Sequence, residues 1–219
     1  MELYTKLTSL KVKVEKNLSP EKLEIIYQAT NELIESNPEK RVIQTGMPVP
    51  DFELIDQFDT SHKSTELYEN EPLVISFYRG VWCPYCNVDL SYLRKSYQKI
   101  KDLGAELVVI SPNLPRFSQY AIQRHKLPFN ILTDYKNQVA KQFGLVFQVS
   151  DKLKDLYLKS FEVNLEKYNG EDSWTLPMPA RFVIDTDGII RYAEYSPDYT
   201  KRPEIRDILQ TLENLRVYN

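Results

Sequence analysis

The chain has 219 residues, enough for one large domain or for a domain with an extension. A net charge of −3 and a pI near 5.6 argue against nucleic acid or an anionic membrane as a partner. The longest apolar runs have the length of strands, far short of the roughly 20 residues of a membrane helix. The N-terminus also lacks the basic start and apolar stretch of a secretory signal. We therefore expect a cytoplasmic protein with no membrane and no nucleic acid as partner.

Residues 1–46 are rich in charge and predict a helical extension. Ser19 and Pro20 form a helix start, with serine as the N-cap and proline at the first helical position. Apolar residues then recur at helical spacing until Asn37-Pro38 ends the helix. The residues at this spacing are Leu23, Ile26, Tyr27, Thr30, Leu33 and Ile34. This helix would pack on the main domain or on a second subunit, so a homodimer is among the expected assemblies.

Residues 47–219 form the predicted main domain, in which strands and helices alternate. Strands are predicted over 52–56, 73–78, 106–111, 129–132, 182–184 and 189–192. Helices are predicted over 84–103, 115–126, 138–143, 151–161 and 205–215. Asp187-Gly188 predicts a hairpin between the last two strands, and the charged segment 162–172 predicts a solvated loop. This order fits an α/β fold with a mixed central sheet flanked by helices.

Cys83 and Cys86 are the only cysteines, and they form a C-x-x-C directly after a buried strand and at the start of a helix. Free backbone N–H groups and the helix dipole at that position favour a thiolate, the reactive form of cysteine. Two inert core cysteines are the alternative. A zinc site needs about four ligands, and His62 and His125 lie far apart in the sequence. We therefore expect no metal and no other cofactor.

Four segments resemble the peroxiredoxin-like branch of the alkyl hydroperoxide reductase/thiol-specific antioxidant family. They are Ile75–Asn87, Glu106–Pro112, Phe129–Asp134 and Pro179–Gly188, and they agree with the family in order and spacing. The resemblance implies a thioredoxin-like fold from about residue 47 to 215. Within the first segment, Cys-Pro-Tyr-Cys is also similar to the glutaredoxin dithiol.

The chain departs from the peroxiredoxin signature at the site itself. By the resemblance, the peroxide-attacking cysteine falls on Cys86, and the family's Thr, Pro and Arg fall on Cys83, Arg79 and Pro179. The register thus implies that Cys86 attacks peroxide and that Cys83 resolves. Cys83 precedes the helix, however, and a more exposed sulfur would favour it as the attacking thiol.

Four further residues are candidate substrate-binding groups. Pro84 is an N1 proline that limits backbone freedom between the sulfurs. Pro179 lies at the position that is cis in thioredoxins, and it would offer edge hydrogen bonds to a substrate or be a plain strand-edge proline. Trp82 would dock a partner or fill the core. Arg79, like Arg181, would stabilise a thiolate or a peroxide oxygen, or be an exposed arginine that does neither.

The resemblance implies a thiol-dependent peroxidase that reduces hydrogen peroxide or organic hydroperoxides. One cysteine becomes a sulfenic acid, the other condenses with it, and a thioredoxin-type protein or glutathione reduces the resulting disulfide. One alternative is a thiol–disulfide oxidoreductase that acts on protein disulfides. A second alternative is a non-enzymatic redox sensor that signals through the N-terminal helix.

Overall fold

The computed structural model describes residues 2–217 and is built on a seven-stranded sheet with the order β2-β1-β5-β4-β3-β8-β9. The strands are β1 (Glu53–Ile55), β2 (Ser61–Lys63), β3 (Leu73–Phe77), β4 (Glu106–Ser111), β5 (Asn130–Thr133), β8 (Ala180–Ile184) and β9 (Ile190–Tyr195). β3, β4 and β5 are parallel, whereas the other neighbouring strands pair antiparallel. The expected mixed central sheet and the β8–β9 hairpin are therefore confirmed.

The interior strands of the sheet are buried on both faces, and β3 is one of them. All five residues of β3 are buried. Leu73, Ile75 and Phe77 pack in one core cluster and Val74 in the other, because successive side chains of a strand point to opposite faces. A run without polar alternation is what a strand between two helical layers requires.

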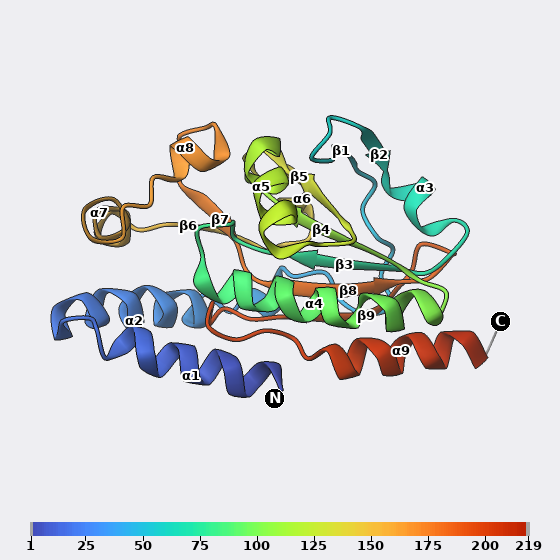
Figure 1. Cartoon of the computed structure of the whole chain (residues 1–219), viewed down its shortest axis with the longest axis horizontal. Coiled ribbons are helices and arrows are strands. Elements are labelled where there is room, and N and C mark those ends of the chain that lie inside the picture. The colour runs from blue at the N-terminus through green and yellow to red at the C-terminus, as the bar shows by residue number, and fades with distance from the viewer. Residues whose placement is uncertain (1, 218–219) are drawn as a thin grey trace.

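Helices cover both faces of the sheet (Figure 1). α4 (Pro84–Asp102), α5 (Pro115–His125) and α9 (Ile205–Val217) share one core cluster with the first N-terminal helix, and α6 (Gln138–Gln142) and α3 (Ser64–Tyr68) contribute to the other. Two short 3-10 turns, η1 (Pro38–Lys40) and η2 (Tyr135–Asn137), connect elements. None of the helices within residues 2–217 has the length and apolar character that crossing a membrane requires.

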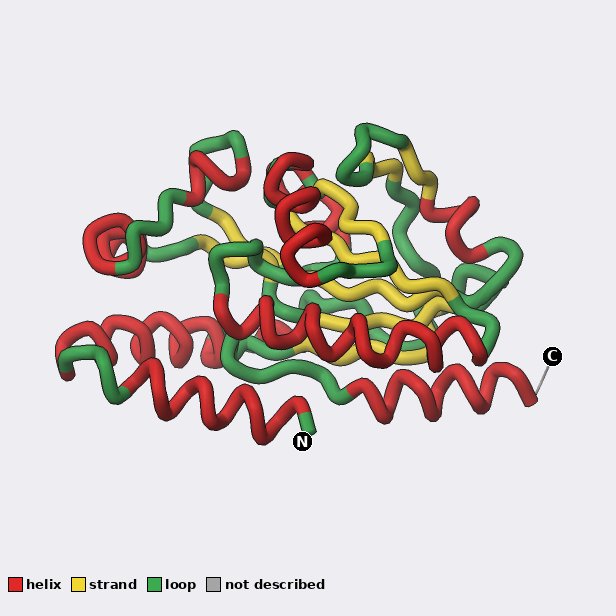
Figure 2. Tube along the Cα trace, viewed as in Figure 1, coloured by secondary structure: helices red, strands yellow, loops and turns green. Residues whose placement is uncertain are grey.

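The expected helical extension is present as α1 (Leu3–Glu15) and α2 (Pro20–Glu35). α1 packs against α4, and its Leu3 and Leu7 are buried in the cluster that contains both cysteines. α2 packs against the later helix α7. Figure 2 shows both N-terminal helices on the side of the molecule where α4 lies. The extension is thus part of the packed structure around the start of α4.

The segment 146–176 forms a small layer of its own. It contains α7 (Asp151–Ser160), α8 (Leu165–Asn169) and β6 (Val146–Gln148), which pairs antiparallel with β7 (Thr175–Pro177) at the end of the segment. The expectation of a solvated loop over 162–172 is wrong. The sequence carries the caps of α8, because Asn164 accepts hydrogen bonds from the first turn and Gly170 ends the helix at φ 72°.

Candidate active site

The loop between β3 and α4 presents the two cysteines at the start of α4. Cys83 is the N-cap, and Cys86 lies in the first turn. Gly80 has a φ of +147°, and a Cβ there would lie 2.5 Å from Trp82 Nε1 and 2.8 Å from the Asn113 side chain, so only glycine fits. The Cys83 N–H donates to the Gly80 carbonyl over 3.1 Å, which fixes the turn just before the helix.

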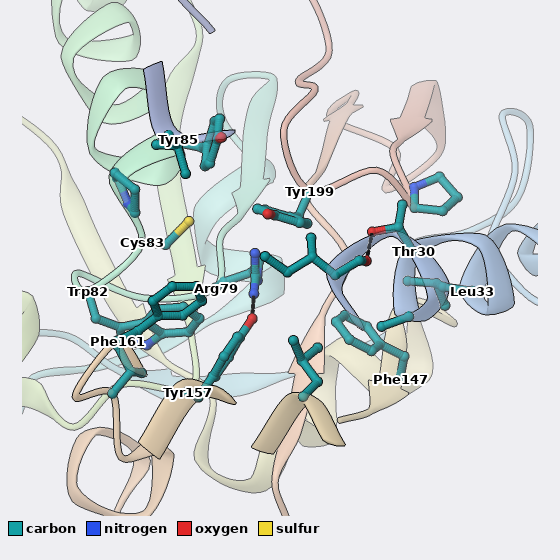
Figure 3. Close-up of a pocket in the computed structure, with 17 residues that line it drawn as sticks. Thr30, Leu33, Arg79, Trp82, Cys83, Tyr85, Phe147, Tyr157, Phe161 and Tyr199 are labelled. Atoms are coloured by element: carbon teal, nitrogen blue, oxygen red, sulfur yellow. Dashed lines mark hydrogen bonds between the residues drawn. The ribbon is translucent and has the colours of Figure 1, made fainter. Parts of the chain in front are cut away.

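Both cysteines are buried, with exposed fractions of 1% for Cys83 and 0% for Cys86. The expectation that Cys83 is the more exposed sulfur holds in direction only, because residues of α2 and α7 line the cavity next to it. The two cysteines nevertheless differ in access. Cys83 lines a cavity of about 270 Å³, whereas Cys86 is not among its lining residues (Figure 3).

The charges around Cys83 favour its thiolate. Burial alone would raise the pKa of the Cys83 thiol. A hydrogen bond from the Cys86 side chain, the guanidinium groups of Arg79 and Arg202 and the backbone N–H of Cys86 outweigh burial and lower this pKa to about 5. These groups therefore favour the charge of the pair on Cys83, the sulfur that lines the cavity.

The pKa of the Cys86 thiol shifts in the opposite direction. Burial, its hydrogen bond to Cys83 and the charge of Cys83 raise the pKa of the Cys86 thiol well above its ordinary value. Arg202 opposes this shift, since its Nη2 donates to Cys86 Sγ over 3.1 Å. The pair thus holds one thiolate and one thiol, and the structure favours Cys83 as the thiolate.

Arg202 is held in place by a buried carboxylate. Its Nε lies 3.3 Å from Asp89 Oδ2, and its Nη1 donates to the Tyr199 and Lys201 carbonyls over 2.7 and 2.6 Å. Asp89 also pairs with the fully buried Arg181. Arg181 therefore positions Asp89, because its guanidinium donates to Asp89 and to the Pro203 carbonyl and to neither sulfur.

Arg79 reaches the other side of the pair and lies among aromatic rings. Its Cζ is 5.0 Å from the ring centroid of Trp82 and 4.5 Å from that of Tyr199, and its Nη2 donates to the Tyr157 hydroxyl (Figure 3). Burial would lower the pKa of Arg79, but Tyr157, Cys83 and other neighbours raise it, so the guanidinium stays charged. Cation–π contacts with desolvated rings reinforce that charge.

The remaining sequence candidates have different outcomes. Trp82 lines the cavity and packs against Tyr157 with ring centroids 5.4 Å apart. Pro84 is exposed at the cavity margin. Pro179 is buried, is not a lining residue, and its carbonyl accepts from Ser196 N over 2.9 Å. No peptide bond within the described residues is cis, so the structure fits the alternative of a plain proline at the edge of strand β8.

Sequence reasoning missed Asp89, Arg202 and the two tyrosines next to Arg79. Asp89 did carry a signal, because it follows Cys86 by three positions on the buried face of α4. Arg202 carried none, since 116 residues separate it from Cys86. Among residues 2–217, no three His, Cys, Asp or Glu side chains gather as metal ligands would.

The match to a known family covers most of this architecture. The sequence model described as the AhpC/TSA family matches residues 45–193. This chain belongs to the AhpC/TSA family. Within the family match lie both cysteines, Arg79 and Asp89, whereas Arg202 and the whole of α2 lie outside it.

The chain is also similar to individual peroxiredoxins in sequence and in fold. The chain is 28% identical over 173 residues to a chloroplastic peroxiredoxin Q of Oryza sativa subsp. japonica, which covers 79% of this chain and 68% of that protein. The chloroplastic peroxiredoxin Q of Sedum lineare is 27% identical over 174 residues, 80% of each chain. The crystal structure of peroxidoxin BcpB from Mycobacterium tuberculosis superposes with a TM-score of 0.62 at 24% identity, over 79% of this chain and 98% of that one. That likeness establishes the thioredoxin-like fold of peroxiredoxins.

Proposed function

We propose that this chain is a thiol-dependent peroxidase in which Cys83 attacks the peroxide and Cys86 resolves the product. The observation that carries the proposal is the Cys83 sulfur on the cavity wall, with a pKa lowered to about 5. Membership of the AhpC/TSA family and the similarity to peroxiredoxins Q support the reaction class. The order of attack is the reverse of the one that the family register implies for Cys86.

In the first step the Cys83 thiolate attacks the terminal oxygen of the hydroperoxide. An S–O bond forms, the O–O bond breaks, and the leaving alkoxide or hydroxide takes a proton to become an alcohol or water. The sulfur loses two electrons and the O–O bond gains them. Charge develops on the leaving oxygen, and the Arg79 guanidinium and the Cys86 backbone N–H, both next to Cys83, are donors that would stabilise it.

In the second step Cys86 condenses with the Cys83 sulfenic acid. The S–O bond breaks, water leaves, and the Cys83–Cys86 disulfide forms. The first step prepares the second, because two of the causes that raise the pKa of Cys86 are its hydrogen bond to Cys83 and the negative charge of Cys83. Both weaken once Cys83 is a neutral sulfenic acid, which leaves Arg202 3.1 Å from Cys86 Sγ to favour the second thiolate.

A dithiol protein of the thioredoxin type, or glutathione, would close the cycle by returning two electrons and two protons to the disulfide. A reducing compartment such as the cytoplasm suits that requirement. The alternative, exchange with protein disulfides, would need the same access to the buried sulfurs as a thioredoxin-type reductant. The similarity to peroxiredoxins Q is what favours the peroxidase over this alternative.

Steady-state turnover tests the proposal. Reduced protein is given hydrogen peroxide with either thioredoxin or glutathione as reductant, and the same sample is given insulin as a protein disulfide. Peroxide consumption that depends on one reductant supports the peroxidase. Insulin reduction without peroxide consumption would identify the chain as a thiol–disulfide oxidoreductase. An absence of both activities would favour the non-enzymatic redox sensor.

We further propose residues 1–46 and 47–219 as two units, with the chemistry in the second and part of the stability in the first. The family match begins at residue 45, and Leu7 of the first unit is buried in the cluster of the cysteines. Leu7→Ala should therefore lower the free energy of unfolding by about 2–5 kcal/mol. Urea unfolding measures this loss, and an unchanged midpoint would show that the first unit adds nothing to stability.

A further inference from the structure

The cavity next to Cys83 has a wall that belongs to this chain rather than to the matched family region. Ile26, Ala29, Thr30 and Leu33 of α2 line it, and all four precede residue 45. The segment 146–176 contributes to both sides of the cavity, with Phe147 beside α2 and Tyr157 beside Trp82. Figure 3 shows Cys83, Trp82 and Tyr157 on one side of the cavity and Thr30, Leu33 and Phe147 on the other.

The side of the cavity formed by α2 and Phe147 has almost no hydrogen-bonding capacity of its own. Ala29, Leu33 and Phe147 are apolar, and the Thr30 hydroxyl already donates to the Ile26 carbonyl over 2.9 Å. The polar groups in the cavity gather instead at the Cys83 end, around Arg79 and Tyr157. A ligand that fits this arrangement has one small polar end and one apolar body.

The volume of the cavity limits the size of the ligand's apolar part. An apolar cavity of roughly 150 Å³ holds a benzene molecule, and this cavity measures about 270 Å³. The space therefore accepts a ring with a short branched substituent. Hydrogen peroxide would leave most of the apolar wall uncovered, whereas an aryl group would remove it from water at about 25 cal/mol per Å².

We propose that α2 makes this site selective for hydroperoxides with a compact apolar group of aryl or branched-alkyl size, an inference that rests on the proposed peroxidase function. The hydroperoxide end meets Cys83 and Arg79, and the apolar group lies against Ala29, Leu33 and Phe147. The chemistry is the step written above, with the corresponding alcohol as the product that leaves the cavity. Ala29 and Leu33 are then specificity-determining residues supplied by the N-terminal extension.

The kinetic test compares cumene hydroperoxide with hydrogen peroxide. In the wild type, kcat/KM for cumene hydroperoxide should exceed that for hydrogen peroxide, and Ala29→Phe, which fills the cavity, should lower this ratio by roughly tenfold. Gln28→Phe adds the same ring on the exposed side of α2 and is the matched control, with an unchanged ratio. Equal ratios in wild type and Ala29→Phe would overturn the proposal. If circular dichroism shows Ala29→Phe unfolded, Leu33→Trp gives the same reading from a partly exposed position.

A binding test separates the proposal from the peroxidase reaction itself. The alcohol 2-phenyl-2-propanol, the product expected from cumene hydroperoxide, cannot oxidise the thiols. It should raise the Tm of the wild type in a concentration-dependent way and leave the Tm of Ala29→Phe unchanged. A wild type that consumes no peroxide but shows this shift would refute the peroxidase and keep the ligand class. Peroxide turnover without any shift by the alcohol would refute the ligand class alone.

Discussion

The surroundings of Cys83 and Cys86 differ more than their positions in the sequence suggest. Both sulfurs share one helix start, and both are buried. Cys83 meets a cavity and Arg79, whose guanidinium lies among aromatic rings and donates to the Tyr157 hydroxyl. Cys86 meets Arg202, whose charge is shared with Asp89. The helix end is common to the two thiols, so it cannot by itself decide which of them ionises.

The difference shows that distant groups distribute the single negative charge of the pair. Arg79 and Arg202 lower the pKa of both thiols. Burial, the hydrogen bond to Cys83 and the charge of Cys83 nevertheless keep the pKa of Cys86 raised. Asp89 and Arg181 then keep Arg202 at the far side of the pair. A thiolate at the cavity and a thiol behind it are the arrangement that attack followed by resolution requires.

Replacing each cysteine has the largest expected effect. Cys83→Ser should lose peroxide reactivity by a factor on the order of 10³ or more, because it removes the thiolate at the cavity. Cys86→Ser should still form a sulfenic acid at Cys83 but no intramolecular disulfide. Mass spectrometry after trapping with dimedone measures both outcomes. A dimedone adduct on Cys86 in Cys83→Ser, at the wild-type rate of peroxide consumption, would reverse the assignment.

Removing the buried carboxylate should have the largest effect on stability. Asp89→Leu leaves Arg181 and Arg202 buried without their partner, which should lower the free energy of unfolding by about 3–5 kcal/mol. Urea unfolding gives the value. Asp155→Asn breaks a comparable contact of 2.7 Å with Lys159 on the exposed side of α7, and it should change stability by less than about 1 kcal/mol. Equal losses in the two variants would contradict the role given to the buried network.

The pH dependence follows from the lowered pKa of Cys83. The thiolate is the attacking form, so the single-turnover rate with peroxide should be flat above neutrality and fall as the pH drops through about 5. Stopped-flow Trp fluorescence of the wild type follows this rate, which should be roughly tenfold lower at pH 4 than at pH 7. Arg202→Met should move the midpoint upward, since Arg202 helps to lower that pKa. Arg206→Met, at an exposed side chain, is the control and should leave the midpoint in place.

The smallest expected effect concerns the hydroxyl that holds Arg79. Tyr157→Phe removes one acceptor from a buried guanidinium, at a cost of about 1 kcal/mol, or roughly a fivefold lower kcat/KM. Tyr120→Phe removes an equivalent tyrosine acceptor from Arg124 on the exposed side of α5 and is the matched control. Equal activity of the two variants would mean that Tyr157 does not position Arg79.

The parts of the fold that local patterns encode could be predicted from the sequence. A continuous apolar run predicted the buried strand β3, and Cys83-Pro84 predicted the start of α4. The three-residue strands β2, β6 and β7 were not predicted, because so short a run has no measurable periodicity.

Only the part of the candidate site that lies within one stretch of sequence could be predicted. The C-x-x-C and Arg79 lie within one stretch of sequence, and the structure does bring them together. Arg202 reaches Cys86 from a loop near the C-terminus, and α2 reaches the cavity from the N-terminus. Contacts over such separations depend on how the helices pack, which a single sequence does not display.

Alkylation of the reduced wild type at pH 6 identifies which sulfur carries the charge. With less than one equivalent of iodoacetamide, the thiolate reacts first. Trypsin then releases Gly80–Arg94, a peptide that contains both cysteines, and its fragment ions locate the label. The label should be found on Cys83 with little on Cys86. A label mainly on Cys86 would contradict the proposed division of roles and restore the order implied by the family register.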